Sequence, residues 1–305
     1  MSLFVMLLIA ISALVWVLYS HMRANRLRRV RAVYRLSVVK EMKALFVRTQ
    51  QHRGLTTGYL NGDHSLQRAI DAARRDINQL WDRIIEMAPE LSEDTRYQGA
   101  HSHWQRLSSK WPTLTVANNI EQHSRLILNH LYLLEDYFVQ NNLVFSLSES
   151  LGLRTFLKEL LDCMEVIGQV RAIGTGVVAL GGSTSVERIR VKFLLEKIES
   201  KRRLVRELLI ASRLAESGRS FTHELAKSDQ AMIALVNLIE KELCKSHHIE
   251  LDAEAFFTLA TTAISPLSEL FDAGIALMER TIATYSTSTV MSMDTLGARS
   301  SLKNA

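Results

Sequence analysis

The chain has 305 residues, of which 47% are hydrophobic, and its 37 lysines and arginines outnumber 32 acids to give a formal net charge of +5. It contains only three prolines, and helix-forming residues dominate, which argues against an all-β protein. The length is sufficient for one large hydrophobic core or two smaller ones.

The N-terminus predicts a membrane anchor. Residues 3–19 read LFVMLLIAISALVWVLY, which is 17 residues with one serine and no charge. This is close to the roughly 20 apolar residues that usually cross a bilayer. No lysine or arginine precedes the run and no small-x-small cleavage site follows it, so we favour an uncleaved anchor over residues 1–22 rather than a signal peptide.

A block of arginines without acids follows the anchor and predicts its orientation. Because positive charge stays on the cytoplasmic side, we predict a single-pass protein of a bacterial inner membrane, with its N-terminus outside and its body in the cytoplasm. Without these six arginines the formal charge is 5 − 6 = −1, so the body lacks the basic surface that nucleic-acid binding needs. The block itself suits anionic lipid headgroups. Its members are Arg23, Arg26, Arg28, Arg29, Arg31 and Arg35.

Helical periodicity continues along the body, and the predicted fold is all-α. We expect an N-terminal transmembrane helix followed by two antiparallel four-helix bundles, because the connections between helices are short. The body covers residues 23–287, the bundles divide near residues 148–151, and residues 288–305 form a flexible tail. The expected helices run from the membrane to about residue 60, then over 64–87, from a Ser92 cap to Trp111, and over 113–146, 148–179, the STSVE segment to about 216, 221–246 and 250–285.

An internal repeat indicates two related halves. Gln51-x-Arg53-Gly54-Leu55-x-Thr57-Gly58 matches Gln169-x-Arg171-Ala172-Ile173-x-Thr175-Gly176 at a constant offset of 118 residues. Each copy lies near the C-terminal end of the first helix of its half.

The repeated segment has the chemistry of an anion site. An arginine and a threonine four residues apart share one face of a helix, and a guanidinium with a hydroxyl offers donors that suit a small planar oxyanion. Neither Arg53 nor Arg171 has a carboxylate three or four residues away on its own helix. Burying an unpaired arginine costs several kcal/mol, so each is exposed, paired with an acid on another helix, or bound to an anion.

These residues also carry a resemblance to a known family. QQHRGLTTGYLNG (residues 50–62) resembles the first motif of the nitrate- and nitrite-sensing (NIT) domain family, and GQVRAIGTGVVALGG (residues 168–182) resembles its second arginine-bearing motif. The resemblance covers about residues 35–287 and implies two four-helix bundles that hold nitrate or nitrite between helices through arginines. One departure is His52, where the family commonly has glutamate or arginine. The predicted ligand-binding residues are Arg53, Arg171, Thr57, Thr175, Gln51 and Gln169.

Two functions fit this pattern. The first is a membrane-anchored cytoplasmic sensor in which the two guanidiniums converge on a pocket without a protein counter-ion, bind nitrate or nitrite, and signal through a cytoplasmic partner protein or through self-association as a homodimer. The alternative is a ligand-free, membrane-anchored scaffold for protein–protein interaction, in which both arginines pair with acids such as Glu135, Asp136 or Glu165. The sequence contains no P-loop, kinase motif, GxSxG or metal-spaced cluster, so we predict neither an enzyme nor a cofactor or metal.

Overall fold

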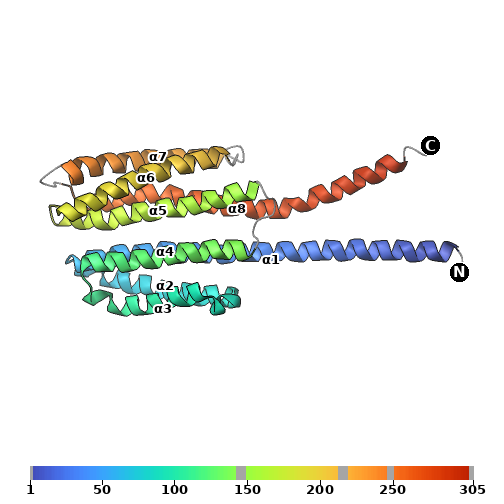
Figure 1. The fold of residues 1–305 in the computed structure, drawn as a ribbon, viewed down its shortest axis with the longest axis horizontal. Coiled ribbons are helices and arrows are strands. Elements are labelled where there is room, and N and C mark those ends of the chain that lie inside the picture. Colours follow the sequence, from blue (N-terminus) through green and yellow to red (C-terminus); the bar gives the residue numbers. More distant parts are fainter. Residues whose placement is uncertain (1–2, 142–148, 212–218, 246–250, 302–305) are drawn as a thin grey trace. The chain divides into compact units, whose positions relative to one another are not determined.

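The computed structural model describes residues 3–141, 149–211, 219–245 and 251–301. Within these ranges the regular structure consists of eight α-helices with short 3₁₀ and π-helical segments, and no strand (Figure 1). The all-α prediction is therefore confirmed for the described residues. The α-helices are α1 (Leu3–Leu60), α2 (Gln67–Met87), α3 (Thr95–Lys110), α4 (Val116–Gln140), α5 (Glu149–Ala179), α6 (Ser185–Ala211), α7 (Arg219–Ile239) and α8 (Ala253–Ser301). The shorter segments are the 3₁₀ turns η1 (His64–Leu66), η2 (Pro89–Glu93) and η3 (Trp111–Thr113), and the π-helical η5 (Glu240–Lys245).

Local side-chain chemistry explains several helix boundaries. Gly62 has a φ of 108°, a conformation that favours glycine, and it lies just past the end of α1. At the start of α6, Thr184 N donates to Glu187 Oε2 at 2.8 Å and Glu187 N donates to Thr184 Oγ1 at 3.2 Å, which forms a capping box within the STSVE segment where the sequence predicts that this helix begins. The cap of α3 differs from the prediction. Asp94 rather than Ser92 accepts from the first amides of the helix, because the turn η2 places Ser92 inside the preceding segment.

Some predicted domain and helix boundaries lie outside the described residues, and one differs from the structure. The predicted division of the bundles near residues 148–151 and the predicted ends of the fourth and sixth helices, near residues 146 and 216, fall wholly or partly outside the described residues. Helix α8 continues to Ser301, so residues 288–301 are helical where the sequence analysis expects a flexible tail. This stretch has no proline and a single glycine, Gly297, so nothing in it stops a helix.

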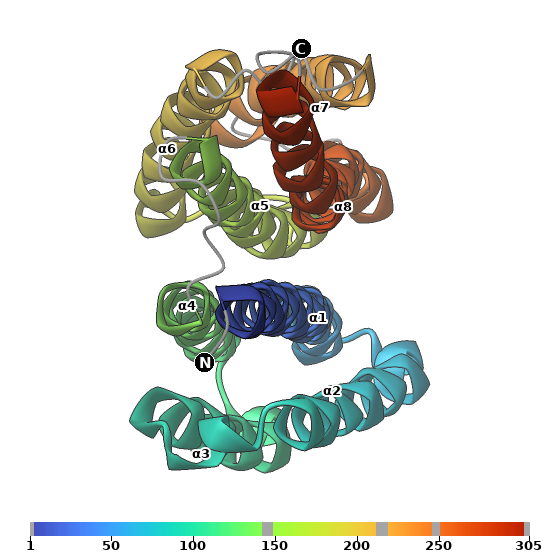
Figure 2. The same ribbon diagram turned by 90° about the vertical axis from the view of Figure 1, so that its right-hand side faces the viewer.

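The chain divides into two compact units, one of Val38–Ile275 and one of Met1–Ser37 with Ala276–Ala305. In the first unit, helices that follow one another pack together: α3 on α4, α4 on α5, α5 on α6, and α6 on α7. Figure 2 shows these helices end-on. Their core is mostly aliphatic, and its largest fully buried side chains, each less than 2% exposed, include Trp81, Trp104, Phe156, Phe221 and Phe256.

The second unit contains the N-terminal part of α1. This part is long and apolar enough to cross a membrane, with a mean hydropathy of 1.6 over its most apolar window. Its side chains from Met6 to Tyr19 are exposed. Length, composition and exposure thus agree with the predicted anchor, while its orientation stays a prediction.

Candidate functional site

Arg53 joins three helices of the larger unit through one buried guanidinium. Its Nη1 donates to Glu165 Oε1 on α5 at 2.6 Å, and its Nη2 donates to Glu165 Oε2 at 3.2 Å. Nη1 also donates to Ser124 Oγ on α4 at 2.8 Å. A two-pronged contact between guanidinium and carboxylate is the strongest form of this interaction. The prediction that Arg53 has no protein counter-ion is therefore wrong, because its counter-ion lies 112 residues away on another helix.

Glu165 is the hub of a buried polar cluster. In addition to Arg53, its carboxylate accepts from Gln50 Nε2 at 2.7 Å and from Gln169 Nε2 at 2.9 Å. The structure thus places the predicted residue Gln169 in the cluster. Gln51 lies elsewhere: its side chain is exposed, and its Oε1 accepts from Arg48 Nη1 at 2.6 Å. One residue along a helix changes the direction of a side chain by about 100°, and it is Gln50 that faces Glu165.

Gly168 allows this close approach between α1 and α5. A Cβ atom at this position would lie 2.8 Å from Arg53 Nη2 and 3.2 Å from Gln50 Nε2. Any other residue would push the guanidinium away from Glu165. Gly168 is therefore required by the buried ion pair and not by a turn.

Arg171 has a different environment from Arg53. It is 6% exposed, its Nη1 donates to Thr261 Oγ1 on α8 at 2.9 Å, and its guanidinium carbon lies 4.7 Å from the centre of the Phe257 ring. Among the described residues no carboxylate lies within 4 Å of it. Burial and, to a smaller extent, the positive charge of Arg53 together lower the pKa of Arg171 to about 10, while Glu165 opposes the shift. The two arginines are thus close enough to repel one another, and both are influenced by the same carboxylate.

The cluster consequently holds two cations and one anion. Arg53 and Arg171 are both buried, and Glu165 is the acid that interacts with both. Two donors also remain unused: Thr175 Oγ1 and Arg53 Nε are buried without a hydrogen-bond partner in the part of the chain that the structure describes. Thr57 is already engaged, since its Oγ1 accepts from Asn119 Nδ2 at 3.1 Å. A small anion beside Arg171 would balance the charge and take up donors that now lack acceptors.

The side chain of His52, the residue that differs from the NIT-family motif, lies on α1 and contacts His123 on α4. His123 Nδ1 lies 2.8 Å from the carbonyl oxygen of Asn119, so it carries the proton, and His123 Nε2 accepts from His52 Nδ1 at 2.8 Å. His52 also meets Trp104 and Trp111 edge-on. Burial lowers the pKa of His52 to about 3 and lowers that of His123 well below its ordinary value. Both histidines are therefore neutral and add no charge to the arginine cluster.

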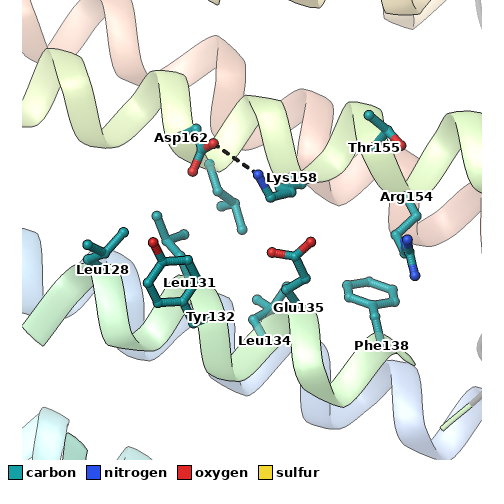
Figure 3. Close-up of a pocket in the computed structure, with 11 residues that line it drawn as sticks. Leu128, Leu131, Tyr132, Leu134, Glu135, Phe138, Arg154, Thr155, Lys158 and Asp162 are labelled. Atoms are coloured by element: carbon teal, nitrogen blue, oxygen red, sulfur yellow. Dashed lines mark hydrogen bonds and ion pairs between the residues drawn. The ribbon is translucent and has the colours of Figure 1, made fainter. Parts of the chain in front are cut away.

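The other acids considered as partners for the arginines lie elsewhere. Glu135 points into a cavity of about 150 Å³ between α4 and α5, which Arg154, Lys158 and Asp162 line from the opposite helix (Figure 3). Asp136 accepts from Arg96 Nε at 2.6 Å. Glu165 is thus the acid that reaches Arg53, and neither Glu135 nor Asp136 does.

Comparison with known proteins bears on the fold. No family model matches the chain, and none of the curated proteins compared with it matches. One solved structure, described as the structure of the NasR transcription antiterminator, is similar with 16% sequence identity and a TM-score of 0.67. The match covers 93% of this chain and 78% of that chain. At this identity the similarity shows that the two chains share a helical fold.

Proposed function

We propose that this protein is a membrane-anchored cytoplasmic sensor that binds a small oxyanion, nitrate or nitrite, and signals through a partner protein. The observation that carries the proposal is the charge imbalance of the buried cluster: among the described residues, Glu165 is the one carboxylate that acts on the two guanidiniums, and it is in contact with Arg53 and not with Arg171. A buried cation without a partner is costly, so a site of this composition favours an added anion.

The ligand would bind at Arg171. Of the two guanidiniums, this one has only a threonine hydroxyl as a hydrogen-bond acceptor among the described residues, and the hydroxyl of Thr175, one turn along α5, is free to donate. A planar oxyanion accepts around its edge, which matches a guanidinium fork with one added hydroxyl. Arg53 would stay paired with Glu165 and contribute its charge.

Binding would change how three helices are held together. Arg171 on α5 already contacts Thr261 on α8, and the positive charge of Arg53 on α1 repels the Arg171 guanidinium. An anion that removes the repulsion between the two guanidiniums favours the arrangement in which α1, α5 and α8 approach most closely. It can shift that equilibrium only by its difference in affinity for the two arrangements.

The motif resemblance and the shared fold support the same function. The two NIT-like motifs are the segments that carry Arg53 and Arg171, and the structure places these on α1 and α5. We propose that α1–α4 and α5–α8 are the two related bundles that the repeat indicates. The similar structure is that of a transcription antiterminator, a regulatory protein. The N-out orientation of the anchor, with the body in the cytoplasm, is part of the proposal.

Nitrate titration of the full-length chain in detergent micelles tests the proposal. Potassium nitrate and potassium nitrite should raise the thermal midpoint relative to potassium chloride of equal ionic strength. A ligand at one hundred times its Kd adds about 2.7 kcal/mol, or roughly 5–10 °C for a domain of this size. Arg171→Ala should abolish this shift. Arg75→Ala, which removes an exposed arginine of α2, is the matched control and should leave it unchanged.

The same titration separates the sensor from the ligand-free scaffold. The scaffold is supported by one observation, the pairing of Arg53 with Glu165. It predicts equal melting in nitrate and chloride, with Arg171→Ala changing only the basal stability. A midpoint that does not move with either anion, or a shift that survives Arg171→Ala, would overturn the sensor.

A further inference from the structure

Helix α6 carries an apolar stripe on its solvent side. Val186, Ile189 and Phe193 are spaced three and four residues apart, so they lie on one face. They are 74%, 70% and 54% exposed, and Leu180, just before the turn into α6, is 72% exposed. The opposite face of α6 is buried in the core. An apolar stripe of this kind on an otherwise packed helix indicates a contact surface.

Basic side chains border the stripe on both sides. At about 100° per residue, Arg190 and Lys197 fall on one edge and Lys192 on the other. None of the three has a carboxylate within 4 Å in the part of the chain that the structure describes. Lys197 Nζ instead lies 4.8 Å from the centre of the Phe193 ring. Two acids lie near the stripe. Glu187 is used as the cap of α6, where it accepts from Thr184, and the exposed Glu196 lies on the same edge as Lys192, so the edge with Arg190 and Lys197 is the more positive of the two.

The rest of α6 shows that these unpaired charges are local. In its second half, Lys201 pairs with Glu159 on α5, and Arg202 and Arg206 both pair with Asp229 on α7, whereas the exposed Arg203 has no carboxylate within 4 Å among the described residues. The helix as a whole has eight basic residues and four acids, although the body of the chain is close to neutral. Positive charge without a partner is thus concentrated where the apolar side chains are exposed.

We propose that this surface, defined by Val186, Ile189 and Phe193 with Arg190, Lys192 and Lys197, docks an amphipathic helix of a partner protein whose apolar face is bordered by aspartate and glutamate. Apolar side chains at i, i+3 and i+7 fit the matching rows of a second helix. Acids on both borders of that helix would meet bases on both edges of the stripe. The stripe is one side chain wide, which suits a helix better than a lipid surface, where a broad apolar face enters the bilayer. The proposal does not depend on anion binding.

The experiment uses the full-length chain in phosphatidylcholine nanodiscs. The probe is a fluorescent helical peptide with leucines at i, i+3, i+4 and i+7 bordered by glutamates, and its binding is followed by anisotropy. The double substitution Arg190→Glu with Lys192→Glu should weaken binding at least tenfold and should create binding of the same peptide with lysine borders. Phe193→Ser should also weaken binding tenfold. Val139→Ser, at a site on α4 that is 52% exposed, is the matched control and should have no effect.

Several results would overturn the proposal. Glutamate- and lysine-bordered peptides that bind equally well, or binding that survives the charge reversal, would show that the bases do not select the partner. Failure of the peptide to bind, with phosphatidylglycerol vesicles captured by the wild type and not by Phe193→Ser, would assign the surface to lipid. A concentration-dependent dimer that Phe193→Ser disrupts would assign it to a second copy of the chain.

Discussion

Replacing Glu165 with glutamine tests the buried charge cluster most directly. The substitution keeps the shape of the side chain and removes its charge, so Arg53 loses the carboxylate that it contacts at 2.6 Å and 3.2 Å. The side chains of Arg53 and Glu165 are only 1% and 7% exposed, so water cannot replace the lost partner. Removing one member of such a buried pair costs about 3–5 kcal/mol, because the remaining charge stays desolvated.

The size of the effect can be expressed in degrees. For a domain of this size 1 kcal/mol corresponds to about 2–4 °C, so the variant should melt roughly 6–20 °C below the wild type in chloride. Nitrate should restore stability to Glu165→Gln at least as strongly as it stabilises the wild type, because the anion would then be the sole negative group facing Arg53 and Arg171.

The measurement is a thermal melt of the full-length chain in detergent, in chloride and in nitrate of equal ionic strength. Glu121→Gln is the matched control, since its carboxylate pairs with Arg125 on the surface of α4 and is 49% exposed. An exposed pair of this kind contributes well under about 1 kcal/mol. If Glu165→Gln melts no lower than Glu121→Gln, the reasoning from buried charge is wrong.

Three further predictions concern the rest of the unit. Burial lowers the pKa of His130 to about 3, so between pH 6.5 and 3 the unfolded chain binds a proton at this residue that the folded chain does not bind. His130 alone should therefore reduce stability by about 1.4 kcal/mol per pH unit on acidification. Because the buried His52 and His123 add losses of their own, His130→Leu should reduce the slope below pH 6.5 by about this amount in melts at pH 7.5 and 5, and an unchanged slope would contradict the assignment. Gly174→Ala should destabilise the protein by about 1–3 kcal/mol, because the added Cβ would lie 2.3 Å from the Phe256 ring. Gly99→Ala, which has open space around it, should instead stabilise α3 by up to about 1 kcal/mol. Thermal melts that rank the two variants in the opposite order would refute the packing argument. Burial raises the pKa of the Cys163 thiol to about 12, so maleimide at pH 8 should label it only after unfolding. Peptide mass spectrometry distinguishes it from the partly exposed Cys244, and labelling of Cys163 in the native chain at the rate of a free thiol would show that the site opens.

Local features of the fold could be predicted from the sequence because their causes are local. The glycine turn after α1 and the capping box of α6 depend on residues within a few positions of the helix end, and both are where the sequence places them. Asp94 and Ser92 show the limit of this reasoning, since both are good caps and the choice depends on the 3₁₀ turn η2, which includes Ser92 and ends just before Asp94. The helical residues 288–301 show another limit: low apolar content predicts disorder, but it does not stop a helix.

The candidate site could be predicted only in part. Spacing along one helix indicated Arg53 and Arg171 as candidate site residues and excluded acids three or four residues away on the same helix. It could not identify the pairing of Arg53 with Glu165, which depends on how α1 packs against α5. A usable signal was present on α5 itself, where Glu165 and Gln169 are four residues apart and share a face. Choosing Gln50 over Gln51 required knowing which face of α1 is turned inward.

The glycine beneath the Arg53 guanidinium has a consequence for how related chains diverge. A bulkier residue at position 168 should reduce stability unless the side chain at position 53 is shortened, and a neutral residue at position 165 should reduce stability unless the guanidinium at position 53 is also lost. The pattern Gln-x-x-Arg on the first helix and Glu-x-x-Gly-Gln on the fifth should therefore be inherited or lost together. Related chains that keep both patterns can form the same buried two-pronged contact between arginine and glutamate.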